Sequence, residues 1–303
     1  MNESSAGILL VHLGTPAAPT EKAVRDFLRA LLSDMVWWPI LHGFILRTRP
    51  ARVAKLYQKI WMTTGSPLRV YAERQIALLG QGQMAMAYGS PSIAEALEKF
   101  KATDPLIVLP LFPQYSMTTT APIVQQVTEI IETWQNPPVV KFIEHYHDEP
   151  LYISALAHSV QNYWQQHGQG KRLLFSFHSI PKSYHRKGDP YFYQCQTTAS
   201  LLAKKLNLKP DEWAVAFQSR LSSFGWIGPG THETLCAWAK QGVGRVDVLA
   251  PGFSTDCLET LEELAIREKQ AFLKAGGEEF HYIPALNDSV GHIEMMQRLA
   301  LCN

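Results

Sequence analysis

The segment RLLFSFHSIP, residues 172–181, is a short apolar run that ends in a histidine and then turns through a proline. Such nearly continuous runs are typical of strands that are buried on both faces of a parallel sheet. Seven more segments have the same character, at residues 7–13, 83–88, 106–112, 139–146, 213–219, 245–251 and 280–286. Apolar residues at helical spacing lie between them, among others at 23–35, 92–101, 190–206 and 233–241. The pattern predicts an α/β fold made of two similar units, each with four parallel strands.

The length of the chain also favours two domains. With 303 residues, of which 46% are hydrophobic, the chain can bury two ordinary cores. The segment HDEPLYISALAHSVQNYW predicts a long helix that begins near residue 150. We predict a first domain over residues 1–149, joined by a C-terminal helix over about 287–303, and a second domain over residues 150–286.

Charge and cysteine content exclude several classes of function. The formal net charge is +1, which predicts no basic face for nucleic acid. The four cysteines are scattered without a CxxC pair, as expected of free thiols in a reducing compartment, and form no zinc or iron–sulfur pattern. The N-terminus lacks the basic start and long apolar core of a signal peptide, and no run reaches 18 apolar residues. We therefore expect a cytoplasmic protein that does not span a membrane.

Side chains that can carry chemistry follow two of the predicted strands, where ligands bind in open parallel sheets. His178 ends one strand, a position that suits a functional histidine and a hydrogen-bonded structural one about equally. Glu259 and Glu263 follow the strand 245–251, and their i, i+4 spacing puts both carboxylates on one helical face. A structural interpretation is also open, since Asp256 and Glu259 match a capping box and Glu263 could be a solvated acid.

Two other regions are candidates for ligand contact. The loop FPQYSMTTTAP, residues 112–122, could hydrogen-bond a carboxylate or phosphate, or form an ordinary polar turn. Within residues 36–71, the apolar VWWPI at 36–40 precedes a basic patch that begins at Arg47. This is either a helix pair with solvated charges or an apolar lip, suited to a flat ligand with carboxylates or to a membrane surface. No GxGxxG or GxxxxGK[ST] follows a strand, which argues against a nucleotide-dependent dehydrogenase.

The segment LLFSFHSIPKSYHRKGDPY, residues 173–191, resembles the signature of ferrochelatases, in which a strand-ending histidine precedes GDPY. Further segments similar to the family stand in the family's order: GILLVHLGTP, YQKIW with GSPL, FPQYSMTTT, FQSRLSSFGWIGPGT, APGFSTDCLETLEEL and YIPALN. The resemblance covers nearly the whole chain, and DCLETLEE and YIPALN look most like proteobacterial members. It implies a chelatase-like α/β fold of two Rossmann-like domains, each a four-stranded parallel sheet flanked by helices.

The resemblance also implies roles for individual residues. His178 matches the histidine that takes up pyrrole protons or meets the iron, and Glu259 matches the acid opposite it, so these two would contact the metal. Glu263 matches the next acid in a chain that leads protons or metal away. The positions that match the porphyrin pocket and its basic lip are Leu13, Arg47, Tyr57, Ser66, Tyr88, Tyr115 and Trp226.

The activity that the resemblance implies is insertion of Fe2+ into protoporphyrin IX, which gives protohaem and releases two protons. Both substrates would be handled by a monomer without a further cofactor, and Cys302 alone near the C-terminus speaks against a [2Fe–2S] cluster. Two alternatives stay open. One is a coproporphyrin ferrochelatase, and the other is a non-catalytic porphyrin- or haem-binding carrier. The second is motivated by Ala87, where the family has arginine, and by a shortened connector at residues 77–85.

Overall fold

The computed structural model describes residues 6–33, 40–220 and 224–301. Contacts between Cα atoms divide the chain into two units. The first holds the chain up to Leu111, Pro122–Ile143 and the residues from Gln297 on, and the second holds Phe112–Ala121 and Glu144–Met296. The boundary near residue 150, and the assignment of the whole C-terminal helix to the first domain, stay predictions.

The first unit contains a parallel sheet in the order β2–β1–β3–β4. Its strands are β1 (Gly7–Gly14), β2 (Gln83–Tyr88), β3 (Leu106–Pro110) and β4 (Val140–Phe142). Its helices are α1 (Glu21–Leu32), α3 (Leu46–Thr48), α4 (Pro50–Ile60), α5 (Pro67–Leu79), α6 (Ile93–Leu97) and most of α7 (Thr120–Ile131), with a π-helical turn at Leu41–Ile45 and a 3-10 turn at Glu98–Phe100. β1 lies inside the sheet, where α5 and α6 contact it.

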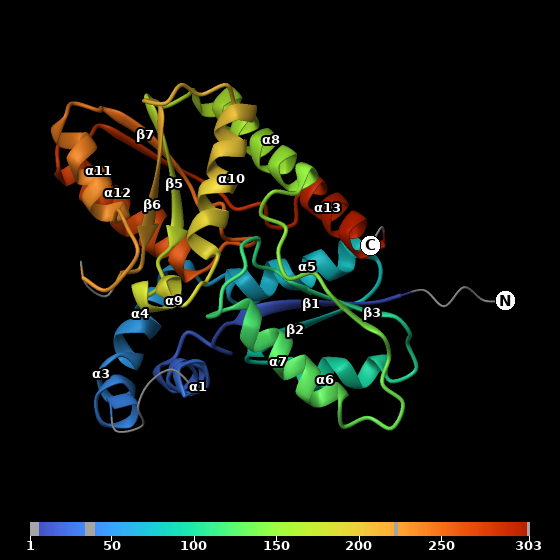
Figure 1. Ribbon diagram of the computed structural model, residues 1–303. Coiled ribbons are helices and arrows are strands. Elements are labelled where there is room, and N and C mark those ends of the chain that lie inside the picture. The colour runs from blue at the N-terminus through green and yellow to red at the C-terminus, as the bar shows by residue number, and fades with distance from the viewer. Residues whose placement is uncertain (1–5, 34–39, 221–223, 302–303) are drawn as a thin grey trace. The chain divides into compact units, whose positions relative to one another are not determined.

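The second unit contains a parallel sheet in the order β6–β5–β7–β8. Its strands are β5 (Arg172–His178), β6 (Trp213–Gln218), β7 (Arg245–Leu249) and β8 (Glu279–Ile283). Its helices are α8 (Pro150–His167), α9 (Lys182–Arg186), α10 (Tyr191–Lys205), α11 (Thr231–Lys240), the π-helix η3 (Glu259–Glu268), α12 (Lys269–Lys274) and the first part of α13 (Val290–Leu301). Figure 1 shows α11 and α12 on one face of this sheet and α8 and α10 on the other.

The two sheets have the same strand order, and this order determines where a ligand can bind. In the second sheet, β5 pairs in parallel with β6 on one side and with β7 on the other. The chain leaves β5 toward α10 on one face and leaves β7 toward η3 and α12 on the opposite face (Figure 1). Such a reversal opens a crevice at the carboxyl ends of the two strands. The predicted fold of two four-stranded parallel sheets is confirmed.

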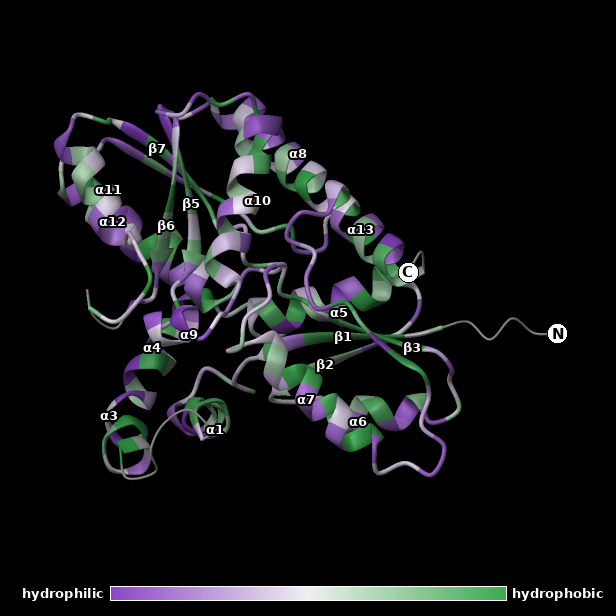
Figure 2. Cartoon of the chain, viewed as in Figure 1, coloured by the Kyte–Doolittle hydropathy of each residue, from purple (hydrophilic) through white to green (hydrophobic). Residues whose placement is uncertain are grey.

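Burial explains why the strands are apolar without alternation. Leu173, Leu174 and Phe175 of β5 are successive residues that point to opposite faces, and each is at most 1% exposed. Leu174 packs with Val248 of β7 and Phe272 of α12 in one buried cluster. Figure 2 shows the corresponding hydrophobic strands between helices that alternate in hydropathy. Each fully buried Leu or Phe side chain contributes roughly 1.5–3 kcal/mol to the free energy of unfolding.

All eight predicted strands are present, and β4 is the one that is much shorter than predicted. It pairs only with Leu106–Val108 of β3, at the edge of its sheet, so the chain leaves it after Phe142. The apolar residues 36–39 of the predicted lip, the end of the helix predicted over 23–35, and Cys302 lie outside the described residues. Within the part of the chain that the structure describes, no helix combines the length and apolar content needed to cross a membrane.

The connector between α5 and β2 is a three-residue turn with two glycines. Gly80 has φ +71°, and a Cβ added to it would meet nothing within 4 Å. Gly82 has φ +96°, and a Cβ added there would lie 2.6 Å from the carbonyl oxygen of Ile8 in β1. Both glycines supply a left-handed backbone, but only Gly82 also lets the chain approach the neighbouring strand closely.

We predict that Gly82→Ala destabilises the chain more than Gly80→Ala. The second variant has only the backbone cost of a left-handed alanine, about 1–2 kcal/mol. Gly82→Ala adds a clash with a strand backbone that cannot move freely, for a total of about 3 kcal/mol or more. Urea unfolding of the two variants measures the difference, and equal midpoints would show that β1 yields to the added methyl group.

Candidate functional site

His178 is the last residue of β5, and Gln218 of β6 lies opposite it in the strand pair. The side chain is partly exposed. Its Nδ1 lies 2.7 Å from the carbonyl oxygen of Ser179. Because a carbonyl oxygen only accepts, Nδ1 carries the proton of the neutral ring. The lone pair is therefore on Nε2, which can take up a proton or bind a metal ion.

The turn after His178 is bound to the loop that carries Trp226. The Ser179 hydroxyl donates to the Ile227 carbonyl oxygen at 2.9 Å. Pro181 and Trp226 form an antiparallel bridge between the two segments. Trp226 remains partly exposed. The turn that follows His178 and the loop that carries Trp226 are thus joined by hydrogen bonds.

Glu259 and Glu263 lie in the helix η3, which has π-helical hydrogen bonding. Sequence spacing predicted a helix here but gave no sign of this type. Helices of the π type are rare and occur frequently at functional sites. The side chains of the two acids differ in exposure: Glu259 is partly exposed, whereas Glu263 is 8% exposed. Glu259 is the more accessible of the two carboxylates.

Gln218 anchors the start of the π-helix. This residue is 2% exposed, and its Nε2 donates to the Glu259 carbonyl oxygen at 2.7 Å. Its Oε1 accepts a hydrogen bond from the Ser176 hydroxyl at 2.8 Å, and that hydroxyl also bonds Thr231 at 2.7 Å. One buried amide therefore joins β5, β6 and η3. Sequence reasoning missed Gln218, whose signal is its place beside His178 at the carboxyl end of the adjacent strand.

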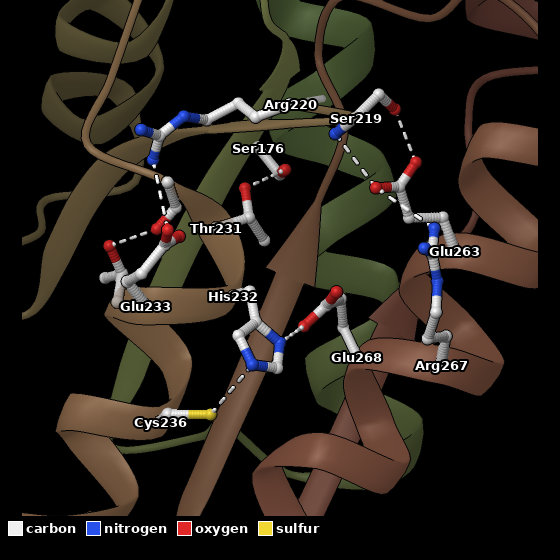
Figure 3. Close-up of polar contacts among 12 residues, drawn as sticks. Ser176, Ser219, Arg220, Thr231, His232, Glu233, Cys236, Glu263, Arg267 and Glu268 are labelled. Atoms are coloured by element: carbon white, nitrogen blue, oxygen red, sulfur yellow. Dashed lines mark hydrogen bonds and ion pairs between the residues drawn. The ribbon is translucent and has the colours of Figure 1, made fainter. Parts of the chain in front are cut away.

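Glu263 is a buried, bonded carboxylate, so its interpretation as a solvated acid is wrong. It accepts hydrogen bonds from the Ser219 backbone N–H at 2.9 Å and from the Ser219 hydroxyl. Arg267 Nη2 lies 3.1 Å from its Oε1. Figure 3 shows this carboxylate facing Ser219 on one side and Arg267 on the other. Ser219 has φ +59°, a left-handed conformation that costs an L-residue roughly 1–2 kcal/mol. Sequence reasoning missed Ser219 as well.

The C-terminal end of the π-helix has a second acid–base contact. Glu268, which is 6% exposed, accepts from His232 Nδ1 of α11 at 2.9 Å (Figure 3). Burial raises the pKa of Glu268, and the hydrogen bond from His232 opposes that shift. Glu259, Glu263 and Glu268 are spaced by four and five residues, so each lies about one π-helical turn from the next. Side chains or backbone at all three positions bind the π-helix to Gln218 of β6, to Ser219 directly after it, or to His232 of α11.

The capping-box interpretation of Asp256 and Glu259 is not supported, because Asp256 is bonded elsewhere. Its Oδ1 accepts from the hydroxyls of Thr260 and Tyr282, and its Oδ2 accepts from Asn287. Burial, and next the Glu259 carboxylate, raise the pKa of Cys257 well above its usual value. The thiol therefore stays protonated, so it does not act as a thiolate ligand.

The loop at residues 112–121 is held by Asp189 of the GDPY segment. Asp189 is 1% exposed, and its Oδ2 accepts from the Ser116 hydroxyl at 2.9 Å and from the Met117 N–H at 2.8 Å. Ser116 is therefore committed to the loop's own structure, which matches the polar-turn interpretation. Tyr115 is partly exposed, and desolvation raises the pKa of its phenol, with Glu144 and Asp189 adding to the shift.

The residues of the first unit that are predicted to contact the porphyrin lie at strand ends and on helices. Leu13 is partly exposed near the end of β1, and Gly14 pairs in register with Tyr88 at the end of β2. A Cβ at Gly14, whose φ is +127°, would lie 1.8 Å from the Tyr88 carbonyl oxygen, so these strand ends are in direct backbone contact. Ser66 is 1% exposed and caps α5 by accepting from the Arg69 N–H at 3.3 Å.

The remaining predicted porphyrin-contact residues, Tyr57 and Arg47, lie on the consecutive helices α4 and α3. Tyr57 is 6% exposed on α4, where its ring meets the edge of Trp61 at 5.9 Å between centroids. Arg47 is exposed on α3. Burial of Tyr57, like the capping bond of Ser66, gives each a structural role in addition to any contact with a ligand.

The chain matches one family along its length. The model of the ferrochelatase family covers residues 5–302. The chain is 48% identical to a ferrochelatase of Nitrosococcus oceani, over 97% of this chain and 85% of that protein. It is 46% identical to a ferrochelatase of Aeromonas hydrophila and 47% identical to one of Vibrio cholerae, in both cases over 98% of each chain.

Solved structures share the fold at much lower sequence identity. SirB from Bacillus subtilis with Fe3+ matches with a TM-score of 0.59 at 14% identity, over 98% of this chain and 96% of that one. CbiX, described as the terminal enzyme of sirohaem biosynthesis in denitrifying bacteria, matches with a TM-score of 0.52 at 15% identity, over 97% and 99%. At these identities the likeness supports the fold alone, which is the chelatase-like pair of Rossmann-like sheets that was predicted.

We predict that Glu263→Ala destabilises the chain by about 3 kcal/mol, because it strips a charge-assisted acceptor from Ser219 and leaves Arg267 only its longer 3.8 Å contact with Glu262. Ser219→Gly is the matched comparison. It loses the hydroxyl bond but keeps the N–H bond to Glu263 and removes the left-handed cost, so we expect a loss below about 1 kcal/mol. Chemical unfolding measures both free energies. A Glu263→Ala variant as stable as Ser219→Gly would show that the contacts of the Glu263 carboxylate do not stabilise the fold.

Proposed function

The chain belongs to the ferrochelatase family, and on this premise we propose that it inserts Fe2+ into protoporphyrin IX and so makes protohaem. In this reaction two pyrrole N–H bonds break, four Fe–N bonds form, two protons leave, and the iron keeps its oxidation state. The chain must therefore supply a group that accepts protons and a group that receives the dehydrated metal ion. Fe2+ accepts imidazole and carboxylate ligands, which His178 at the end of β5 and Glu259 at the start of η3 offer.

The observation that carries the proposal is the fixed tautomer of His178. The Ser179 carbonyl oxygen holds the proton on Nδ1, so the unprotonated Nε2 can take a pyrrole proton without a prior rearrangement. Imidazole is the side chain whose ordinary pKa lies nearest neutrality, which suits a base that must also release the proton again. We propose that His178 is this base and also meets the iron.

Glu259 is the proposed acidic partner of His178. Its backbone is held by Gln218, while the residue itself is partly exposed and lies close to the neutral Cys257 thiol. A neutral thiol does not compete for a metal ion as a thiolate would, so the Glu259 carboxylate is the proposed ligand at this position. Glu263 is proposed to act next along the same helix, where its contacts with Ser219 and Arg267 hold the carboxylate in place.

The porphyrin is proposed to lie against Leu13, Tyr57, Ser66, Tyr88, Tyr115 and Trp226, with Arg47 near a carboxylate substituent. We propose a cytoplasmic monomer with no cofactor besides the substrate Fe2+. Peripheral membrane contact through the first unit is also proposed, since Phe44 is 62% exposed and Ile40 is 49% exposed beside the exposed Arg47. Apolar side chains next to cationic ones suit a membrane interface and an apolar ligand alike.

We predict that His178→Ala lowers the rate of metal insertion on the order of 10²–10⁴-fold, the usual loss when a general base is removed. Porphyrin binding should survive, because the substitution leaves the residues proposed to contact the porphyrin unchanged. Anaerobic absorption changes with Fe2+ or Zn2+ and protoporphyrin measure turnover, and porphyrin fluorescence measures binding. His158→Ala, on an exposed position of α8, is the control.

Three outcomes of that assay separate the functions. Near-normal turnover of His178→Ala would contradict its role as base. Wild-type protein that binds protoporphyrin but never metallates it would indicate a carrier, the alternative that Ala87 motivates. Faster turnover with coproporphyrin than with protoporphyrin would instead select the coproporphyrin enzyme.

We predict that Glu259→Gln slows metal insertion by roughly a hundredfold or more while the unfolding midpoint stays near that of the wild type. The amide keeps the size of the side chain and removes its charge, and the bond from Gln218 goes to the backbone and is not altered. Steady-state metallation and thermal unfolding are measured on the same preparation. A variant that loses stability but keeps its rate would assign Glu259 a structural role only.

A further inference from the structure

Three potential metal ligands outside the proposed active site lie close together in the second unit. They are His145, His147 and Asp148, in the segment EHYHDEP between β4 and α8. One ligand atom from each lies within 4.8 Å of the other two. Among the residues that the structure describes, this is the one group of three or more such side chains that satisfies this distance. None of the three was singled out by sequence reasoning.

Inside the cluster, the imidazole and the carboxylate are at a separation that a hydrogen bond does not explain. His147 Nδ1 and Asp148 Oδ1 are 3.6 Å apart, beyond the range of a normal N–H···O bond. Two ligands that each bind one metal ion at about 2.1 Å, near tetrahedral angles, lie roughly 3.4 Å apart. The observed separation is close to that of two ligands sharing an ion.

His147 supplies the second, independent observation. The residue is 9% exposed, and its Nδ1 is buried without a hydrogen-bond partner among the described residues. A buried polar atom left unbonded costs about 1–3 kcal/mol, and an unseen ion or water is one of the recognised reasons why such an atom persists. An ion bound by this nitrogen would remove the cost.

The backbone around the cluster is fixed before any ion binds. The His147 carbonyl oxygen accepts from the buried Thr198 hydroxyl at 2.7 Å. Between the two histidines, Tyr146 is 2% exposed and its hydroxyl bonds Ser254 at 2.8 Å. The rings of His145 and His147 lie 5.0 Å apart between centroids. Little conformational entropy would therefore be lost on binding, which favours affinity.

Some charges near the cluster favour binding of a cation and others oppose it. Burial, which outweighs the effect of Asp148, lowers the pKa of His147. Asp148 is exposed and contributes a negative charge. Lys204 and Lys205 line a hollow that Asp148 also borders, and their positive charges oppose a cation. The site should thus bind moderately rather than tightly.

We propose that His145, His147 and Asp148 bind one divalent first-row transition-metal ion at a site separate from His178 and Glu259. Two imidazoles and one carboxylate suit Fe2+, Co2+ and Zn2+, whereas Mg2+ and Ca2+ prefer all-oxygen sites. This site stands on geometry and donor chemistry, and it does not depend on the proposed reaction. Since Fe2+ belongs to the class that it accepts, the site would hold iron on the surface of the unit that carries His178.

Calorimetric titration with Co2+ tests the site. The full-length His178→Ala chain is used, because that background removes the proposed metal-contacting imidazole of the reaction. We expect one Co2+ to bind. His145→Gln and Asp148→Asn, both at exposed positions and so not expected to perturb folding, should each weaken binding at least tenfold.

His158→Gln in the same background is the matched control, because His158 is also exposed and lies on the adjoining helix α8. It should leave Co2+ affinity unchanged. A second readout is the thermal midpoint, which Co2+ should raise in the background chain and in His158→Gln but less in the two ligand variants. Absence of Co2+ binding to the background chain, or equal affinity in all variants, would overturn the proposal.

Discussion

The central position of β5 is the constraint on which the second unit depends. Because β5 pairs in parallel with β6 and β7, its last residue, His178, must emerge between the carboxyl ends of both neighbours. The side chain that lies opposite it, Gln218, then spans the gap to the first residue of η3. A parallel sheet thus sets the histidine and the acidic helix at one edge, and a single amide keeps the helix start in place.

The acidic helix is stabilised by contacts that differ along its length. Glu259 is held by its backbone, which leaves its carboxylate partly exposed, whereas Glu263 and Glu268 use their carboxylates to bind Ser219 and His232. Buried carboxylates are costly unless they are paired and hydrogen-bonded, and these two are. Of these three acids Glu259 alone is partly exposed, while the carboxylates of Glu263 and Glu268 hold the helix to its neighbours.

The sequence predicted what depends on local periodicity and missed what depends on long-range contacts. Apolar runs such as 172–178 predicted every strand, because burial on both faces leaves a pattern that a single segment can show. The burial of Glu263 depends on Ser219, 44 residues earlier in the chain, so spacing alone could not reveal it. The π-helical type of η3 was missed because residue spacing alone does not distinguish a π-helix from an α-helix. The capping role of Ser66 is different, because it is local: its hydroxyl accepts from the N–H of Arg69, three residues on, and Pro67 follows it, a pattern that the sequence does show.

His178 and His147, two of the three histidines proposed to bind metal, differ in how Nδ1 is used. In His178 the Ser179 carbonyl oxygen fixes the proton on Nδ1, which leaves one nitrogen with a definite role as base or ligand. In His147 the Nδ1 is buried and unbonded, so no tautomer is fixed and the nitrogen gains most from an ion. A base must exchange protons repeatedly and needs a permanent orienting acceptor, whereas a ligand can obtain its orientation from the metal itself. The Ser179 carbonyl oxygen therefore suits His178 to act as a base, whereas His147, which has no such acceptor at Nδ1, is suited to act as a ligand.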